Sequence, residues 1–85
     1  MTVTVYSIPS CPKCSAAKAL LKRKGVSFEE ADAKEKEQEM LEKLERNGIP
    51  ADSAMMPVID IEGNITQGFD REKIENALKE KGLIQ

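Results

Sequence analysis

The sequence predicts a small α/β protein in which a four-stranded mixed sheet carries helices on both faces. Stretches in which apolar and polar residues alternate, as in strands, are interleaved with stretches in which apolar residues recur every three or four positions, as in helices. The resulting order is β-α-β-α-β-β-α. A helix between the first two strands makes them parallel by the right-handed crossover rule, and a short turn makes the last two an antiparallel hairpin. We expect one domain, 1–85.

The first strand and the first helix have well-marked ends. Val3 and Val5 alternate with Thr2, Thr4 and then Tyr6, which predicts a strand, and Pro9 ends it. A helix is predicted over 13–24, where Ala, Leu, Lys and Arg are frequent. Pro12 suits its first turn because the N–H that proline lacks has no partner there, and Gly25 stands at the usual stop position.

The second strand and the second helix are predicted from weaker patterns. Residues 26–29 alternate and indicate a short strand. Asp32 and Glu35 resemble a capping box, which opens a charged helix that ends near Asn47-Gly48, before a loop over 49–56. The apolar stripe of this helix consists of Met40, Leu41 and Leu44. Its other residues mix both signs of charge, which is typical of a solvated face.

The last three elements are predicted as a hairpin and a helix. Strands over 57–61 and 65–67 flank a tight turn in which Gly63-Asn64 can take positive φ angles. Asp70 is a good N-cap for a final helix over 71–81.

The composition excludes several classes of function. The 13 Lys and Arg residues do not outnumber the 15 Asp and Glu residues, and aromatic side chains are scarce, so we expect no nucleic-acid partner. We see no secretory signal and no apolar run long enough to span a membrane. The expectation is a cytoplasmic monomer.

Both cysteines lie in one short motif, Cys11-Pro12-Lys13-Cys14, in a chain without histidine. Zinc usually takes four Cys or His ligands, so a zinc or iron–sulfur site would need carboxylates or the cysteines of two chains. A structural disulfide would close a very small loop and stabilise little. A pair of redox-active thiols between a strand and a helix is the fourth alternative.

The position of the motif favours redox chemistry. Cys11 falls at the N-cap or N1 edge of the predicted helix, where free N–H groups and the helix dipole favour a thiolate, and Lys13 adds positive charge. Cys14 follows one turn later, close enough to attack a mixed disulfide on Cys11. These positions assign Cys11 as the nucleophile and Cys14 as the resolving thiol.

The chain resembles the glutaredoxin family of the thioredoxin fold, including the NrdH-type redoxins. The resemblance rests on Val3–Tyr6, on Cys11–Cys14, on Met56-Pro57-Val58 and on Gly68-Phe69-Asp70. It implies a dithiol–disulfide oxidoreductase that reduces protein disulfides and is itself re-reduced by glutathione or by a thioredoxin reductase. This dithiol mechanism requires no organic cofactor and no metal.

The resemblance also implies a substrate groove. The proline of the family is cis and packs beside the CxxC motif, which here predicts a cis Met56–Pro57 bond next to Cys11, with the backbone of Met56 pairing with the substrate. The candidate substrate-binding residues are Tyr6, Lys13, Met56, Pro57, Phe69 and Asp70. Structural roles compete with these assignments: a packed strand aromatic for Tyr6, core filling or an incidental surface-loop position for Met56, a core cap for Phe69 and a helix N-cap for Asp70.

Two departures from the family bear on the choice of substrate. Glutathione-using members typically have a lysine three residues before the first cysteine, and Thr-Val-Pro at the cis-proline. This chain has Ile8 and Met55-Met56-Pro57 at those places. Gly68-Phe69 resembles a Ser-Gly-Phe segment of the NrdH redoxins, which take electrons from thioredoxin reductase. The alternative function is a metal or iron–sulfur carrier that uses the cysteines of two chains.

Overall fold

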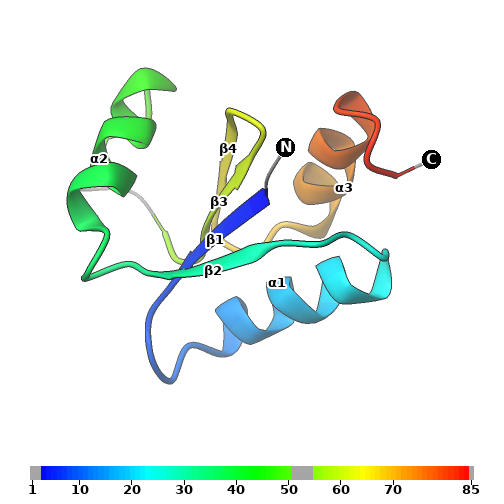
Figure 1. The fold of residues 1–85 in the computed structure, drawn as a ribbon, viewed down its shortest axis with the longest axis horizontal. Helices are drawn as coiled ribbons and strands as arrows, with labels where there is room; N and C mark the ends of the chain where they lie inside the picture. The colour runs from blue at the N-terminus through cyan, green and yellow to red at the C-terminus, as the bar shows by residue number, and fades with distance from the viewer. Residues whose placement is uncertain (1–2, 51–54, 85) are drawn as a thin grey trace.

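The computed structural model describes residues 3–50 and 55–84 and shows one four-stranded sheet in the order β2-β1-β3-β4 (Figure 1). In chain order the elements are β1 (Val3–Ser7), α1 (Pro12–Arg23), β2 (Glu29–Asp32), α2 (Glu37–Arg46), β3 (Val58–Ile61), β4 (Asn64–Gln67) and α3 (Arg71–Glu80). As predicted, β1 and β2 are parallel, whereas β3 runs antiparallel to both β1 and β4. None of the helices in the described ranges is long and apolar enough to cross a membrane.

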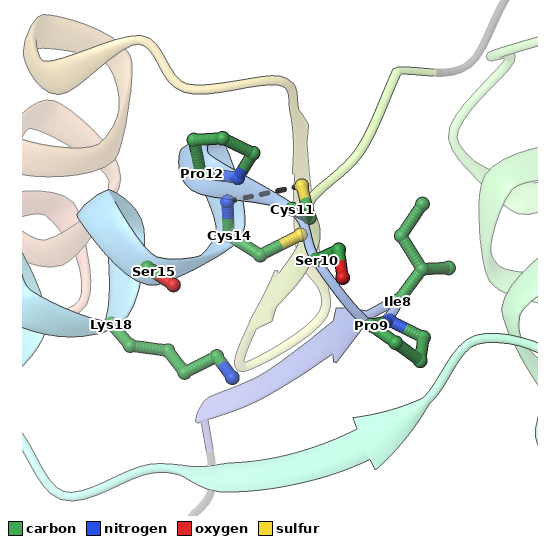
Figure 2. A pocket seen from close by; sticks show the side chains of 8 residues that line it. All are labelled: Ile8, Pro9, Ser10, Cys11, Pro12, Cys14, Ser15 and Lys18. Carbon is green, nitrogen blue, oxygen red and sulfur yellow. Dashed lines mark hydrogen bonds between the residues drawn. The ribbon is translucent and has the colours of Figure 1, made fainter.

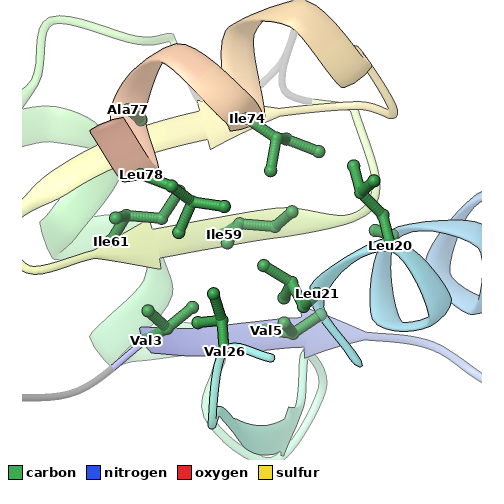
Figure 3. Close-up of a cluster of buried hydrophobic side chains, with 11 residues drawn as sticks. Val3, Val5, Leu20, Leu21, Val26, Ile59, Ile61, Ile74, Ala77 and Leu78 are labelled. Carbon is green, nitrogen blue, oxygen red and sulfur yellow. The ribbon is translucent and has the colours of Figure 1, made fainter. Parts of the chain in front are cut away.

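Helices cover both faces of the sheet, as the alternation along the strands predicts. Val3 and Val5 point to the face covered by α1 and α3, where they join a buried cluster with Ile59 and Ile61 of β3 (Figure 3). The helices contribute Ala17, Leu20, Leu21, Ile74, Ala77 and Leu78 to the same cluster. Tyr6 points to the other face, which α2 covers. Two apolar layers therefore sandwich one sheet.

Helix α1 ends as its sequence predicts. Gly25 has a φ of 72°, a conformation that costs glycine little. Its N–H donates to the carbonyl oxygen of Lys22, and the N–H of Val26 donates to that of Leu21. This pair of bonds satisfies carbonyls at the helix end and turns the chain so that Val26 enters the core.

The predicted second strand is displaced by three residues. The structure places β2 at Glu29–Asp32 rather than at 26–29, and Val26 lies in the core without belonging to a strand. Backbone pairing with β1, from Thr4 opposite Glu29 to Ser7 opposite Asp32, defines this strand. Because β2 is an edge strand with exposed, charged side chains, its sequence carries no apolar alternation.

The predicted capping box begins a turn instead of a helix. Asp32 Oδ1 accepts hydrogen bonds from the N–H groups of Lys34 and Glu35, at 2.8 and 3.3 Å. Helix α2 starts only at Glu37, after Lys36, which makes no side-chain capping bond. The predicted apolar stripe is confirmed, since Met40 and Leu44 are buried against the sheet.

The hairpin turn lies one residue earlier than predicted. Ile61 pairs with Asn64, so the two turn residues are Glu62 and Gly63, with φ angles of 49° and 94°. Asn64 already belongs to β4. The N–H of Gly63 donates to Oδ1 of Asp60 in β3 at 2.8 Å, and this hydrogen bond stabilises the turn.

Candidate active site

The cysteine motif begins where β1 leaves the sheet. After β1 ends at Ser7, a short loop includes Ser10, whose φ is 60°, and delivers Cys11 to the N-cap of α1. Pro12 occupies the first turn, and the N–H of Ser15 donates to the carbonyl oxygen of Cys11 at 3.1 Å. The helix therefore starts at the first cysteine, as predicted.

Cys11 is placed to form a thiolate. It is half-buried, and its Sγ accepts a hydrogen bond from the N–H of Cys14 at 3.2 Å (Figure 2). A hydrogen bond from the Cys14 side chain is the largest influence that lowers the pKa of Cys11; backbone N–H groups of Cys14 and Lys13 and the charge of Lys13 act in the same direction. A lower pKa raises the fraction of the attacking species near neutral pH.

Cys14 has the opposite character. It is 2% exposed, and this burial is the main cause that raises its pKa, followed by its hydrogen bond to Cys11. The two sulfur atoms lie next to one another at the start of α1 (Figure 2). One thiol is therefore partly exposed, with a lowered pKa, and the other is buried, with a raised pKa.

A pocket of about 430 Å³ opens beside the two thiols. Ile8, Pro9, Ser10, Cys11, Pro12, Cys14, Ser15 and Lys18 line it (Figure 2). Ile8 is 40% exposed. The pocket therefore offers an approaching disulfide a mostly uncharged lining that includes both cysteines.

The predicted groove residues converge at the same end of the sheet. The Met56–Pro57 bond is cis, as predicted. Because Tyr6 pairs with Val58, the end of β1 and Pro57 lie at the same end of the sheet. The N–H of Gly68 donates to the carbonyl oxygens of Met55 and Pro57, which joins this segment to the start of α3. A direct role of Met56 or Pro57 in substrate binding stays a prediction.

The side chains of the predicted groove differ in exposure. Phe69 is 40% exposed and lines a hollow against α1, whereas Met56 packs partly into the α2-side core. Asp70 is the N-cap of α3, since its Oδ1 accepts from the N–H of Lys73 at 3.1 Å. Lys13 is exposed next to Cys11. Substrate contacts of Lys13, Phe69 and Asp70 stay predictions.

The prediction that Tyr6 contacts a ligand is wrong. Its side chain is 0% exposed and belongs to the α2-side core, and its hydroxyl donates to Glu39. The Lys43 ammonium lies 5.0 Å from its ring centroid. Tyr6 therefore joins α2 to the sheet, which is the structural alternative for this residue.

Sequence reasoning missed Lys18. It lines the pocket and forms an ion pair with Glu30 of β2 at 2.7 Å. Its spacing of four residues from Cys14 places both on one helix face and was the available signal. Within the described ranges, no three Cys, Asp or Glu side chains gather so that they could hold a metal ion.

A model of the glutaredoxin family matches residues 3–65. The chain belongs to the glutaredoxin family. This glutaredoxin is 32% identical over 77 residues to an uncharacterized glutaredoxin-like 8.6 kDa protein in the rubredoxin operon of Clostridium pasteurianum, covering 91% of the chain and 97% of that protein. The family and the two cysteines give it a general role in thiol redox chemistry.

Solved structures show the same thioredoxin-like fold. The glutaredoxin of Brucella melitensis superposes with a TM-score of 0.65 at 35% identity, covering 99% of this glutaredoxin and 88% of that chain. The glutaredoxin-like protein NrdH-redoxin from Escherichia coli, which has a thioredoxin-like activity profile, gives 0.67 at 25% identity, covering 89% and 93%.

Proposed function

We propose that this chain reduces disulfide bonds in partner proteins through Cys11 and Cys14. The observation that carries the proposal is the asymmetry of the two thiols, one half-exposed at a helix N-cap and one buried beneath it. Nucleophilic attack needs an accessible thiolate, and resolution needs a second thiol within reach of the first. The pair meets both needs with no organic cofactor or metal.

The reaction has two steps. The Cys11 thiolate attacks one sulfur of the substrate disulfide, and the other substrate sulfur leaves as a thiolate. Cys14 then loses its proton to solvent and attacks Sγ of Cys11, which breaks the mixed disulfide and releases the second substrate thiolate. The two released thiolates take up protons, and two electrons have passed from the dithiol to the substrate.

We propose a flavoprotein reductase of the thioredoxin-reductase type, rather than glutathione, as the electron donor. The pocket carries Ile8 where glutathione-using relatives carry a lysine, so a charged contact for a glutathione carboxylate is missing there. The thioredoxin-like activity profile of the E. coli NrdH-redoxin supports the same choice. The proposed setting is the cytoplasm, with the protein acting as a monomer.

Cysteine variants test the dithiol mechanism. Cys11→Ser should abolish reduction of insulin by the protein, and Cys14→Ser should trap a mixed disulfide that mass spectrometry detects. Full activity of Cys11→Ser would refute the mechanism. Anaerobically purified protein that contains zinc, or that is coloured and contains iron, would instead support a carrier that uses the cysteines of two chains.

A comparison of donors tests the second part of the proposal. The oxidised protein is mixed either with NADPH and a thioredoxin reductase or with glutathione, glutathione reductase and NADPH, and consumption of NADPH is followed. We expect faster re-reduction by the thioredoxin reductase. Faster re-reduction by glutathione would overturn the choice of donor and leave the dithiol chemistry intact.

A further inference from the structure

Lys18 lies between the two thiols and the edge strand β2. The pocket at the cysteines and a second hollow of about 320 Å³ along β2 share Ile8, Pro9 and Lys18, so they form one groove. Figure 2 shows the Lys18 side chain extending from α1 toward β2, on the same helix as Cys14. Among the residues that line the pocket of the thiols, Lys18 alone carries a charged ammonium or carboxylate group.

The second step of the proposed reaction needs a charge near Cys14. Cys14 is 2% exposed, and burial disfavours a thiolate. While Cys11 is bound in a mixed disulfide, its hydrogen bond to Cys14 and its charge, which both raise the pKa of Cys14, are removed, but the larger effect of burial stays. The stabilisation of a Cys14 thiolate must then come from other groups around the pocket.

We propose that Lys18 is a positioning residue for the resolving step: its ammonium stabilises the Cys14 thiolate, and Glu30 moderates this effect by pairing with the same ammonium. The proposal rests on the proposed function, since it concerns the second step of that reaction. Residues four apart on a helix are neighbours, which puts the Lys18 stem on the Cys14 face of α1.

The surroundings of Cys14 agree with this role. On α1 the ionisable groups that face it are Cys11 and Lys18, and the charge of Lys18 acts to lower the pKa of Cys14. The loop before α1 contributes a backbone hydrogen bond from Ile8. Across the groove, Glu30 and Asp32 of β2 supply negative charge.

Glu30 makes the effect of Lys18 adjustable. The Lys18 side chain is 26% exposed and the Glu30 side chain 59% exposed, so water can replace the carboxylate as the partner of the ammonium. The ion pair with Lys18 is the main cause that lowers the pKa of Glu30, and Lys22 adds to it. Glu30 is therefore charged at neutral pH and partly cancels the positive field at Cys14.

A neutral dipyridyl disulfide measures the two steps separately. Attack by Cys11 releases one chromogenic thiopyridone at a rate proportional to reagent concentration. Attack by Cys14 on the resulting mixed disulfide releases the second thiopyridone at a rate independent of that concentration. Because the reagent carries no charge, Lys18 cannot act by attracting it.

Two variants should change the rate of the second phase in opposite directions, and a third should leave it unchanged. Lys18→Met keeps most of the apolar stem and should slow the second phase roughly two- to fourfold at neutral pH, because the smaller thiolate fraction is partly offset by higher nucleophilicity. The midpoint of its pH profile should move up. Glu30→Gln should speed the phase and move the midpoint down, and Lys18→Arg should restore the wild-type profile.

A purely structural ion pair would behave differently. If Lys18 and Glu30 only tether α1 to β2, Lys18→Met and Glu30→Gln would change the second phase in the same direction, which overturns the proposal. No change in either variant also overturns it, with the dithiol mechanism unaffected. A wild-type protein that shows no second phase would refute both.

Discussion

Replacing Cys14 by alanine and by serine separates its two contributions to the reactivity of Cys11. Both variants keep the backbone N–H of residue 14, which lies 3.2 Å from Cys11 Sγ. Only serine keeps a side-chain donor in place of the thiol that lowers the pKa of Cys11 most. We therefore expect a higher pKa of Cys11 in Cys14→Ala than in Cys14→Ser.

The expected size of the pKa difference follows from the kind of hydrogen bond that Cys14→Ala removes. Bonds to a charged acceptor are stronger than neutral ones, but a thiol is a weak donor, and water replaces part of the loss at a half-exposed sulfur. We expect the thiolate fraction of Cys11 at neutral pH to fall roughly fourfold in Cys14→Ala. Because a more basic thiolate is a better nucleophile, the rate should fall only about twofold.

The assay is the reaction of the single remaining thiol with a neutral dipyridyl disulfide across a range of pH. A group whose pKa is raised reaches its plateau at higher pH, so the Cys14→Ala profile should lie below that of Cys14→Ser at neutral pH. At alkaline pH Cys11 is fully ionised in both variants, and Cys14→Ala should then react about twofold faster than Cys14→Ser. The two curves should cross. Coincident profiles, or an alanine profile displaced to lower pH, would refute the hydrogen bond as the cause.

Three further predictions concern stability and the groove. Leu21→Ala, at a fully buried position on α1, should lower the free energy of unfolding by about 3 kcal/mol, and Leu41→Ala, at a half-buried position on α2, by less than about 1.5 kcal/mol. Equal losses in denaturant unfolding would contradict the described packing of α1. Asp70→Ala should lower the free energy of unfolding by about 1 kcal/mol through loss of the N-cap, whereas Asp70→Asn keeps a capping oxygen and should leave it unchanged. A raised KM for a protein disulfide in Asp70→Asn, with unchanged stability, would show that the charge of Asp70 contacts the substrate. Glu62→Asn should raise the free energy of unfolding by about 0.5 kcal/mol, because asparagine tolerates the positive φ of this turn better; a lower melting temperature would contradict this.

Local sequence patterns sufficed to predict the helices and strands whose own side chains or backbone signals determine where they begin and end. Val3 and Val5 alternate because one face of β1 is buried, and Pro12 and Gly25 mark helix ends by backbone chemistry alone. The N-cap position of Cys11 follows from the same chemistry. These features require no knowledge of distant residues.

The features that were displaced or missed depend on partners far along the chain. The strand at Glu29–Asp32 exists because β1 pairs with it, and the turn at Glu62 is fixed by the register of Ile61 opposite Asn64. The helical spacing puts Lys18 on the Cys14 face of α1, but its ion pair with Glu30 depends on the fold, which brings β2 near α1. The alternation places Tyr6 on one face of its strand, but the burial of its ring depends on where α2 packs.

The location of Tyr6 gives the protein an internal optical probe. It is the single tyrosine in a chain without tryptophan, so it dominates the near-ultraviolet signal. Its ring lies under α2, on the face of the sheet opposite the helix that carries the thiols. Spectra of the unmodified protein can therefore follow the docking of α2 while thiol reagents follow the active site, with no label on either face.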